Sequence, residues 1–520
     1  MRAPALLKGA AALAIVAAAA VGCRSLPLPP PGARITTVAP FDTGATKLGQ
    51  AIGPLAAAHP GHSGVIALPD GRDAFAARVL LARSAERSLD VQYYLWHNDL
   101  TGVLMFDALR EAAARGVRVR LLLDDNNTDG LDPVLALLDA DPNIEVRLFN
   151  PFRMRAWRGL GYMLDFGRLN RRMHNKSFTI DNQATIVGGR NIGNEYFGAA
   201  GDMLFVDLDV LAVGPIVRDV SQDFDRYWNN ASAYPFSMLV QSGTIAPQAA
   251  LALADRAKLL RGRNEAQRYL EAIRVSPFVE QLMQRSLPLE WSLVRLVSDD
   301  PAKVMGTADP DDRVVVQLQR LWGQPERRLD LVSPYFVPGS EGATALAAIA
   351  RRGVTVRVLT NSLEATDVAA VHAGYAKRRH ELLRAGVQLF ELRRSGDADR
   401  PDVRRGPLGS STSSLHAKTF SVDGRSVFVG SFNMDRRSID LNTEMGFVID
   451  NPAMAQRLHG ALEQRMPERA YEVRLDGEGE LVWIERSEGK AVRHTREPGI
   501  SIWRQMAVRI LSLLPIDWLL

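Results

Sequence analysis

Cysteine is nearly absent from this chain of 520 residues, which contains only Cys23. A single cysteine cannot form an internal disulfide, and it excludes a zinc site built from several cysteines. The net charge is only +4, without the strong or clustered basic excess of a dedicated nucleic-acid-binding protein. Hydrophobic residues make up 46% and charged residues 23%, which excludes a disordered, collagen-like or coiled-coil protein and, at this length, predicts two globular domains.

The N-terminal segment lacks a hydrophobic run long enough to cross a bilayer. Arg2 and Lys8 precede an apolar, alanine-rich stretch over residues 9–21, which is short for a hydrocarbon core of about 30 Å. Small residues then lead to Cys23, so residues 1–22 are predicted to be a secretory signal. This stretch resembles a bacterial lipoprotein signal, in which Cys23 would be lipidated; the alternative is a plain signal anchor with an inert thiol.

The chain repeats one pattern of predicted strands and helices. In each half a β-rich run leads to a helical pattern, a glycine suited to a left-handed helix cap, and an apolar strand. The β-rich runs cover 88–94 and 328–335, the glycines are Gly116 and Gly353, and the apolar strands cover 117–123 and 354–359. This alternation predicts an α/β fold with a mostly parallel sheet, covered by helices on both faces.

Composition and pattern divide the chain into six segments. They are a lipoprotein signal peptide (1–22), a Pro-rich tether (23–63), a first half (64–246), a helical connection (247–290), a second half (291–475) and a C-terminal tail (476–520). The tail carries an amphipathic pattern over 502–520, which predicts a helix that lies in a bilayer interface or packs on the protein. Residues 393–414 lack periodicity and are predicted to be a long, mobile loop.

One motif, His-x-Lys-x4-Asp, occurs twice. Its residues are His174, Lys176 and Asp181 in the first half and His416, Lys418 and Asp423 in the second half. Each copy is followed by a second pair of matching residues, Gly189 and Asn191 in the first half and Ser431 and Asn433 in the second half. The asparagine stands 17 residues after the motif histidine in both copies. Two matching copies are very improbable by chance, so the pair indicates a shared function.

The repeated motif supplies groups that suit a phosphodiester. Residues i and i+2 of a strand face the same side, so the histidine and the lysine of each copy point together. Two imidazoles and two ammonium groups form a receptor for a phosphodiester and for its dianionic transition state. Since the ordinary pKa of imidazole is near 6.5, one histidine can be a neutral nucleophile while the other is a protonated acid. No carboxylate trio or His/Cys cluster stands out, so neither a metal nor another cofactor is predicted.

The doubled motif resembles the phospholipase D superfamily, and the resemblance covers most of the chain after residue 64. Longer stretches, such as SLDVQYYLWHNDLTG, RRMHNKSFTIDNQATIVGGRNIGNEYF and the ending LLPIDWLL, are similar to bacterial cardiolipin synthases of the C type. The resemblance implies two similar α/β/α sandwich halves with the active site between them. It also implies a covalent phosphohistidine intermediate and a reaction without a metal.

The resemblance also implies roles for the motif residues. His174 would be the nucleophile and His416 the general acid, later the base. Lys176 and Lys418 would hold the phosphate oxygens, and the asparagines of both copies, at 191 and 433, would donate hydrogen bonds to the same group.

Acidic residues downstream would orient the two histidines. Glu444 follows His416 in the second half, and Asp207 aligns with Glu444 in the repeat, with Asp209 as the alternative. Such an acid fixes the tautomer of a histidine and supports its imidazolium form.

The remaining motif residues are expected to support the site. Asp181 and Asp423 belong to the catalytic motif but are expected to buttress it rather than to transfer protons. Gly189 and Ser431 are expected to let the backbone approach the phosphate closely.

Export and the resemblance together predict phosphatidyl transfer between phospholipids, which is cardiolipin synthesis. The expected substrates are phosphatidylglycerol and, as a possible donor, phosphatidylethanolamine, at a membrane surface and without nucleic acid. The expected location is the bacterial cell envelope, as a lipoprotein facing the periplasm. The alternatives are a phospholipase D-type hydrolase, an exported phosphodiesterase or nuclease whose only candidate basic groove is residues 152–172, and a lipid-binding protein with a decayed site.

Overall fold

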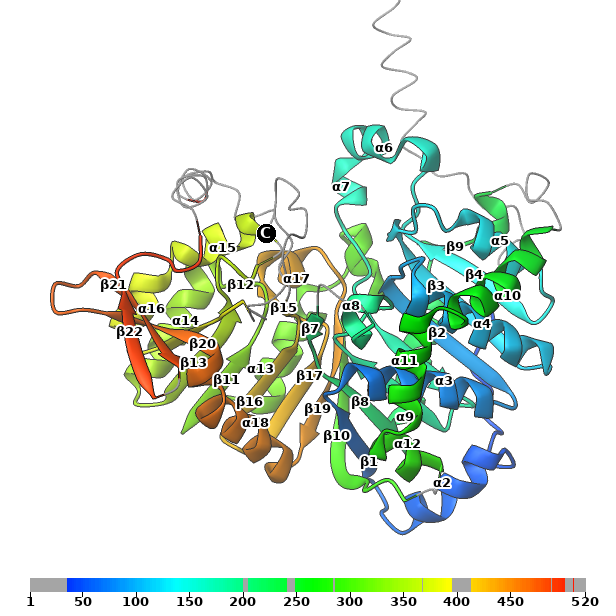
Figure 1. Cartoon of the computed structure of the whole chain (residues 1–520), viewed down its shortest axis with the longest axis horizontal. Coiled ribbons are helices and arrows are strands. Elements are labelled where there is room, and N and C mark those ends of the chain that lie inside the picture. Colours follow the sequence, from blue (N-terminus) through cyan, green and yellow to red (C-terminus); the bar gives the residue numbers. More distant parts are fainter. Residues whose placement is uncertain are drawn as a thin grey trace, which may run out of the picture.

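The computed structural model describes residues 35–199, 204–240, 248–283, 286–366, 368–394, 413–487, 489–500 and 508. Two halves lie side by side and share one continuous sheet of 18 strands (Figure 1).

The first half contributes eight strands to this sheet. They are β1 (Ser63–Leu68), β2 (Ser88–Leu95), β3 (Arg118–Asn127), β4 (Ile144–Phe149), β5 (Ser177–Ile180), β6 (Ala184–Gly188), β8 (Asp209–Val213) and β9 (Ala233–Pro235). Its principal helices are α3 (Gly71–Ser84), α4 (Leu100–Ala114), α5 (Asp132–Asp139) and α9 (Ile216–Trp228).

The second half repeats this series. Its matching strands are β10 (Glu290–Ser298), β11 (Arg328–Val332), β13 (Thr355–Asn361), β14 (Gln388–Leu392), β16 (Lys418–Val422), β17 (Ser426–Gly430), β19 (Met445–Asp450) and β20 (Ala470–Leu475). Its helices include α13 (Val314–Trp322), α14 (Gly339–Arg351), α15 (Ala369–Ala376), α16 (Arg379–Arg384), α18 (Pro452–Gln464) and α19 (Met466–Arg469).

The strand order confirms the internal repeat. From its outer edge inward, the first half runs β9-β4-β3-β2-β5-β6-β8-β1, and the second half runs β20-β14-β13-β11-β16-β17-β19-β10. The inner strands β1 and β10 pair antiparallel and join the halves. Each of the eight strands of the first half therefore has a counterpart in the second half.

The prediction of a mostly parallel sheet is wrong. Parallel pairing is confined to β2-β3-β4 and to β11-β13-β14, the strands that follow one another through crossover helices. The strands on either side pair antiparallel. The reason is local, because short turns such as the one between β5 and β6 can only join antiparallel neighbours.

Helices cover both faces of the sheet, as predicted. Phe75 of α3 and Phe106 of α4 belong to a buried cluster on one face. Val217 of α9 and Met454 of α18 belong to another cluster, which also takes in strands of both halves. This shared core holds the two halves together at the strands that carry the site.

The tether predicted over 23–63 does not extend that far in the described part of the chain. Residues 47–57 form helix α2 (Lys47–Ala57), with Thr46 as its cap. Before it, the backbone of Thr37 and Ala39 donates to Asn229 and Asp225 at the end of α9. Residues 35–63 thus belong to the first half, while residues 1–34, with the predicted signal and Cys23, lie outside the described residues.

The connection and the tail also have structure. The predicted helical connection forms α10 (Gln248–Arg261), α11 (Asn264–Arg274) and α12 (Pro277–Met283). The tail adds β21 (Leu481–Ser487) and β22 (Lys490–His494) to the edge of the sheet next to β20. The amphipathic pattern over 502–520 and the loop over 395–412 lie outside the described residues, apart from Val508. Of the helices that the structure describes, none combines the length and apolar character needed to cross a membrane.

Candidate active site

The two motif segments meet because each half extends a strand-like segment to the other. The backbone N–H of His174 donates to Thr443 at 2.8 Å, and that of His416 donates to Val206 at 2.9 Å. In the second case a short parallel pair forms between β7 (Leu204–Val206) and β15 (Ser413–Leu415). His174 therefore enters the site beside Thr443 of the second half, the residue just before Glu444. In the same way, His416 enters it beside Val206 of the first half, just before Asp207.

This exchange assigns the orienting acids across the halves. Glu444 of the second half contacts His174 Nδ1 through Oε2 at 2.8 Å. Asp207 of the first half contacts His416 Nδ1 through Oδ2 at 2.6 Å. The sequence predicts both acids, but nothing in it indicates that each serves the histidine of the other half.

The structure decides between Asp207 and Asp209. The Asp209 carboxylate pairs with Arg78 at 2.8 Å and lies 3.5 Å from Arg190, and all three side chains are buried. Asp209 is thus part of a buried ion-pair network, and Asp207 is the acid at the site.

The two lysines lie beside the histidines of their own motifs. Lys176 Nζ donates to the backbone oxygen of His174 at 2.6 Å. Lys418 Nζ lies 3.0 Å from Nδ1 and 3.2 Å from Nε2 of the His416 ring. The predicted pairing of histidine and lysine on one side is confirmed, although the histidines stand just before β5 and β16 rather than within them.

An aromatic ring packs edge-on against each histidine. The ring centroids of Tyr94 and His174 are 4.8 Å apart, and those of Tyr196 and His416 are 5.1 Å apart. Tyr196 was not a predicted site residue, because it has no aromatic counterpart at the same place in the second repeat. These rings limit the rotation of the imidazoles and shield them from water.

Burial and neighbouring charge set the proton affinities of the site. Burial lowers the pKa of His174 to about 4, with Lys176 and Lys418 acting in the same direction against Glu444. Burial and Lys418 lower the pKa of His416 to about 3, against the opposing effect of Asp207. The lysine of each half thus acts on the histidine of the other half, so the four groups form one electrostatic unit.

The charges of the lysine and the acids respond to the same environment. Burial, with Lys418 acting in the same direction, lowers the pKa of Lys176 to about 7 against the opposing effect of Glu444. Burial raises the pKa of Asp207, but His416 and Lys418 outweigh that effect and bring it to about 2. Near pH 7 the protein therefore offers neutral imidazoles, each held by a carboxylate.

The two asparagines, which are predicted to bind the phosphate, differ in their contacts. Asn191 Nδ2 donates to Tyr196 Oη at 3.0 Å, which connects it to the ring that packs on His416. The Oδ1 atoms of Asn191 and Asn433 are buried and have no hydrogen-bond partner among the described residues.

Gly189 and Ser431 do not serve the predicted purpose of opening the backbone to a phosphate. A Cβ atom on Gly189 would stand 2.2 Å from Asp207 Oδ1, so the space above this glycine is filled by the orienting acid. The Ser431 hydroxyl donates to Glu444 Oε2. Both positions support a carboxylate, because the acid must lie close under the backbone turn to reach the opposite histidine.

The motif aspartates lie outside the reacting centre. Asp181 follows β5 at the end opposite His174, and its carboxylate accepts hydrogen bonds from the backbone N–H groups of residues 86–88. Asp423 does the same for residues 326–328. Both have a positive φ, near +50°, in tight turns. The expected structural role therefore fits their contacts, and their grouping with the catalytic residues does not.

One group of side chains in the described part of the chain has the spacing of a cation site. It consists of His97, Asp99 and Glu195. The Asp99 carboxylate already accepts from the backbone N–H groups of Gly102 and Asn194, which cap α4 and α8 (Asn194–Phe197). These contacts account for Asp99 without a metal ion.

Comparisons with known proteins agree with this geometry. The family described as "Cardiolipin synthase, PLD-like domain" matches residues 80–228 and 318–466, one match in each half. Cardiolipin synthase C of Escherichia coli is 50% identical over 477 residues, which cover 91% of this chain and all of that protein. An uncharacterized protein of Helicobacter pylori is 30% identical over 91% of this chain and 93% of its own length. The phosphatidylserine synthase structure from Haemophilus influenzae covers 82% of this chain and 92% of its own, with 16% identity and a TM-score of 0.52.

The fold and the doubled site define an enzyme of the phospholipase D superfamily, in its phosphatidyltransferase class. More narrowly, the chain belongs to the cardiolipin synthase family with phospholipase D-like domains.

Proposed function

We propose that this protein makes cardiolipin by transferring a phosphatidyl group from one phospholipid to another through a covalent phosphohistidine. The observation that carries the proposal is the pair of histidines, each held at Nδ1 by a carboxylate of the opposite half, with two lysines that act electrostatically on both. Such a set can attack a phosphodiester, neutralise its charge and move one proton.

In the first step His174 attacks the phosphorus of the donor lipid. Its Nδ1 is held by Glu444, which leaves Nε2 as the nucleophilic nitrogen. The new bond joins Nε2 to phosphorus, and the bond from phosphorus to the head-group oxygen breaks. His416 Nε2 gives its proton to that oxygen, so the head group leaves as an alcohol.

In the second step a hydroxyl of phosphatidylglycerol attacks the phosphorus. It gives its proton to His416, and the phosphorus–nitrogen bond to His174 breaks. The products are cardiolipin, free His174 and a protonated His416 that is ready for the next donor. The chemistry divides one difficult displacement between two easier ones.

The charges of the protein support these roles. Asp207, with its pKa near 2, stays ionised and stabilises the imidazolium form of His416. A phosphodiester anion between the lysines raises the pKa of His416, because it offsets the positive charges that lower it. The acid form of His416 is thus favoured when donor lipid is bound.

The finer assignments belong to the same proposal. The donor is phosphatidylglycerol or phosphatidylethanolamine, and the reaction takes place at a membrane surface. Lipidation at Cys23 would tether the protein to the cell envelope on the periplasmic side, as the sequence before that cysteine predicts.

Lipid analysis in a cardiolipin-deficient bacterial host tests the function. Expression of the chain should yield cardiolipin together with free glycerol or ethanolamine, and the released alcohol identifies the donor. His174→Ala should yield neither product. Accumulation of phosphatidic acid without cardiolipin would instead identify a hydrolase with the same first step.

A further inference from the structure

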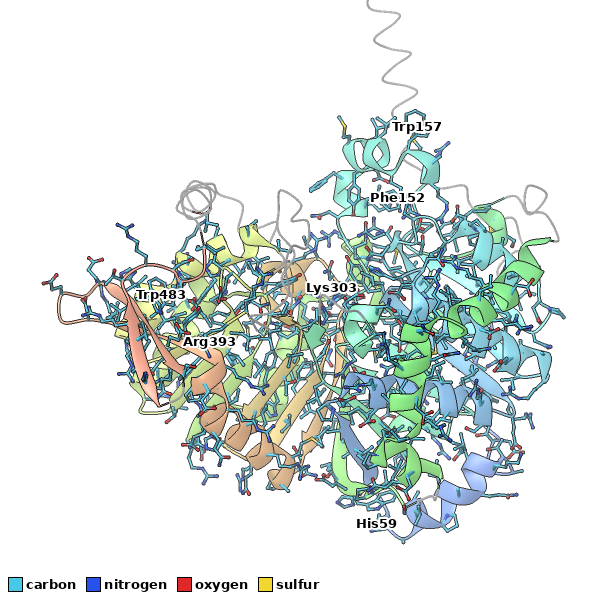
Figure 2. All side chains as sticks on the ribbon, in the orientation of Figure 1. His59, Phe152, Trp157, Lys303, Arg393 and Trp483 are labelled. Atoms are coloured by element: carbon cyan, nitrogen blue, oxygen red, sulfur yellow. The ribbon has the colours of Figure 1, made fainter. Side chains whose placement is uncertain are left out.

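A helical projection stands between β4 and β5 of the first half. It covers residues 152–169, here termed the finger, and contains a short 3-10 turn (Arg155–Trp157), α6 (Arg158–Leu164) and α7 (Phe166–Leu169). Figure 1 shows α6 and α7 beyond the end of the sheet, away from the helices that cover it. In Figure 2 Trp157 lies at the outer end of the finger and Phe152 nearer the body.

The outward side of the finger is apolar. Its exposed side chains are Trp157 (69%), Leu160 (42%), Met163 (82%) and Phe166 (42%). The described residues contain sixteen exposed large hydrophobic side chains, and four of them fall within the ten positions from 157 to 166. Such a concentration marks an interaction surface, whereas single exposed apolar residues do not.

The inward side of the finger is held by polar contacts as well as by buried apolar residues. Arg155 pairs with Asp125 and Asp132, and Tyr162 donates to Asn126 at 2.6 Å. The finger thus attaches to the protein through these polar contacts and through the buried Phe152 and Leu169, and it leaves the apolar side chains of its outward side in solvent.

The base of the finger lies beside the active site. α7 ends five residues before His174, and the intervening Asn170 accepts hydrogen bonds from Arg437 at 2.8 and 2.7 Å. Arg437 belongs to α17 (Arg436–Asp440), which follows Asn433. The finger is therefore fixed to both halves at the edge of the reacting centre.

The charges of the finger do not suit a nucleic acid. The segment 152–172 contains six arginines and one aspartate. However, the guanidinium groups of Arg155, Arg158 and Arg168 are engaged by aspartates at distances of 3.7 Å or less. These pairs reduce the positive charge that the finger would offer to a nucleic acid.

We propose that the finger docks on a phospholipid bilayer and inserts its apolar side into the interface, next to the mouth of the site. The inference rests on the proposed function, because a phospholipid substrate must pass from a bilayer to the paired histidines. A tryptophan with neighbouring methionine, leucine and phenylalanine is suited to the boundary between head groups and acyl chains. Since Arg155, Arg158 and Arg168 are paired with aspartates, we expect apolar insertion to dominate the binding, and vesicle binding should depend little on salt.

A site-specific probe tests the contact directly. Cys23 is the only cysteine, so Cys23→Ser with Met163→Cys carries a single thiol for an environment-sensitive fluorophore. Vesicles of phosphatidylethanolamine and phosphatidylglycerol should shift its emission to the blue, and brominated lipids should quench it. The matched control is Cys23→Ser with Phe41→Cys. Phe41 is 75% exposed, and the neighbouring Pro40 accepts from Asn182 in the turn at the end of β5 opposite His174.

The outcomes of the probe experiment are distinct. A shift at position 163 without a shift at position 41 supports docking through the finger. No shift at 163, or equal shifts at both positions, overturns it.

Activity separates docking from catalysis. Trp157→Ser with Met163→Ser should lower turnover of vesicle lipids on the order of tenfold or more, because both side chains lose their apolar contact. Turnover of short-chain phospholipid monomers should stay within about twofold, and Phe41→Ser should change neither. Unchanged vesicle activity, or an equal loss with monomers, would contradict the proposal. If the unmodified chain transfers no phosphatidyl group while the probe at 163 still inserts, the proposed function fails and the docking surface stands.

Discussion

At the scale of single residues, the electrostatics of the site depend on two buried lysines. Lys176 is held near a pKa of 7 by burial and by Lys418, so it loses its charge as the pH rises through neutrality. Because the lysine must be charged to hold a phosphate oxygen, the free enzyme should lose affinity for donor lipid above pH 7.

We expect kcat/KM to fall about tenfold per pH unit above this point, since kcat/KM reports the free enzyme. The fall in kcat should begin at higher pH, because the bound phosphate raises the pKa of Lys176. Lys176→Arg keeps its charge and should move the fall in kcat/KM upward by more than one pH unit. Lys258→Arg on the exposed side of α10 is the control and should leave the pH profile unchanged. If the fall in kcat/KM stayed at the same pH in Lys176→Arg, the fall would not come from the titration of Lys176.

Gly189 offers a second test at the residue scale. Gly189→Ala should push Asp207 away from His416, because the new Cβ would lie 2.2 Å from Asp207 Oδ1. We expect kcat to fall by about 10² or more, as when a triad acid is removed.

The Gly189→Ala effect should not add to that of Asp207→Ala in the double variant, since both act through the same carboxylate. Gly460→Ala in α18, where a Cβ meets nothing within 4 Å, should leave kcat unchanged. Additive losses in the double variant would show that Gly189 acts in another way.

At the scale of elements, the hairpins that carry the motifs are fixed from their far ends. Asp181 closes the turn after β5 and accepts three backbone N–H groups at the start of β2. Asp423 closes the turn after β16 in the same way for β11. Each aspartate thus fixes the register of a motif strand against a central parallel strand.

Asp181→Ala should lower the free energy of unfolding by about 2–4 kcal/mol, because three backbone donors lose a buried acceptor and alanine resists a positive φ. Asp181→Asn should lose less, since asparagine tolerates that conformation. Asp423→Ala should also lose less, because the Asp423 carboxylate is only partly buried, whereas that of Asp181 is fully buried. Chemical denaturation measures these differences, and kcat of the folded variants should stay within about threefold. A large loss of kcat without a loss of stability would place Asp181 in the chemistry instead.

At the scale of the whole molecule, the two halves depend on each other for the arrangement of the site. Each half supplies a histidine to the site and an acid to the histidine of the other half. The shared core below α9 and α18 keeps the halves in register, so the site is complete only when both halves are joined.

This exchange predicts an unusual pattern of variant effects. Asp207→Asn should behave like His416→Ala: both lose turnover of natural lipids by about 10² to 10⁴ but keep part of it with a donor that has a good leaving group. Glu444→Gln should lose turnover with both donors, because it weakens the nucleophile His174. Initial rates with paired donors measure the pattern. If Asp207→Asn instead lost turnover with both donors, and Glu444→Gln only with natural lipids, the pattern would be reversed. Each acid would then serve the histidine of its own half, or the two histidines would have exchanged roles.

The sequence by itself determined the repeat, the two motifs and the family. These features are local, since strand and helix periodicity, glycine caps and an eight-residue motif appear in contiguous stretches. The helical connection was predictable for the same reason. The structural role of Asp181 and Asp423 could be anticipated as well, because an aspartate that ends a motif strand is placed at a turn.

Only the tertiary structure decided which acid serves which histidine. The contacts join residues 270 and 209 positions apart, and no pattern in the sequence encodes such a pairing. The tertiary structure also decided that antiparallel strands flank each parallel core and that Gly189 and Ser431 support the two acids. It likewise decided which side of the finger faces outward. Each depends on which surfaces meet once two repeats pack together, and that choice is made by the summed burial and hydrogen bonding of the whole chain.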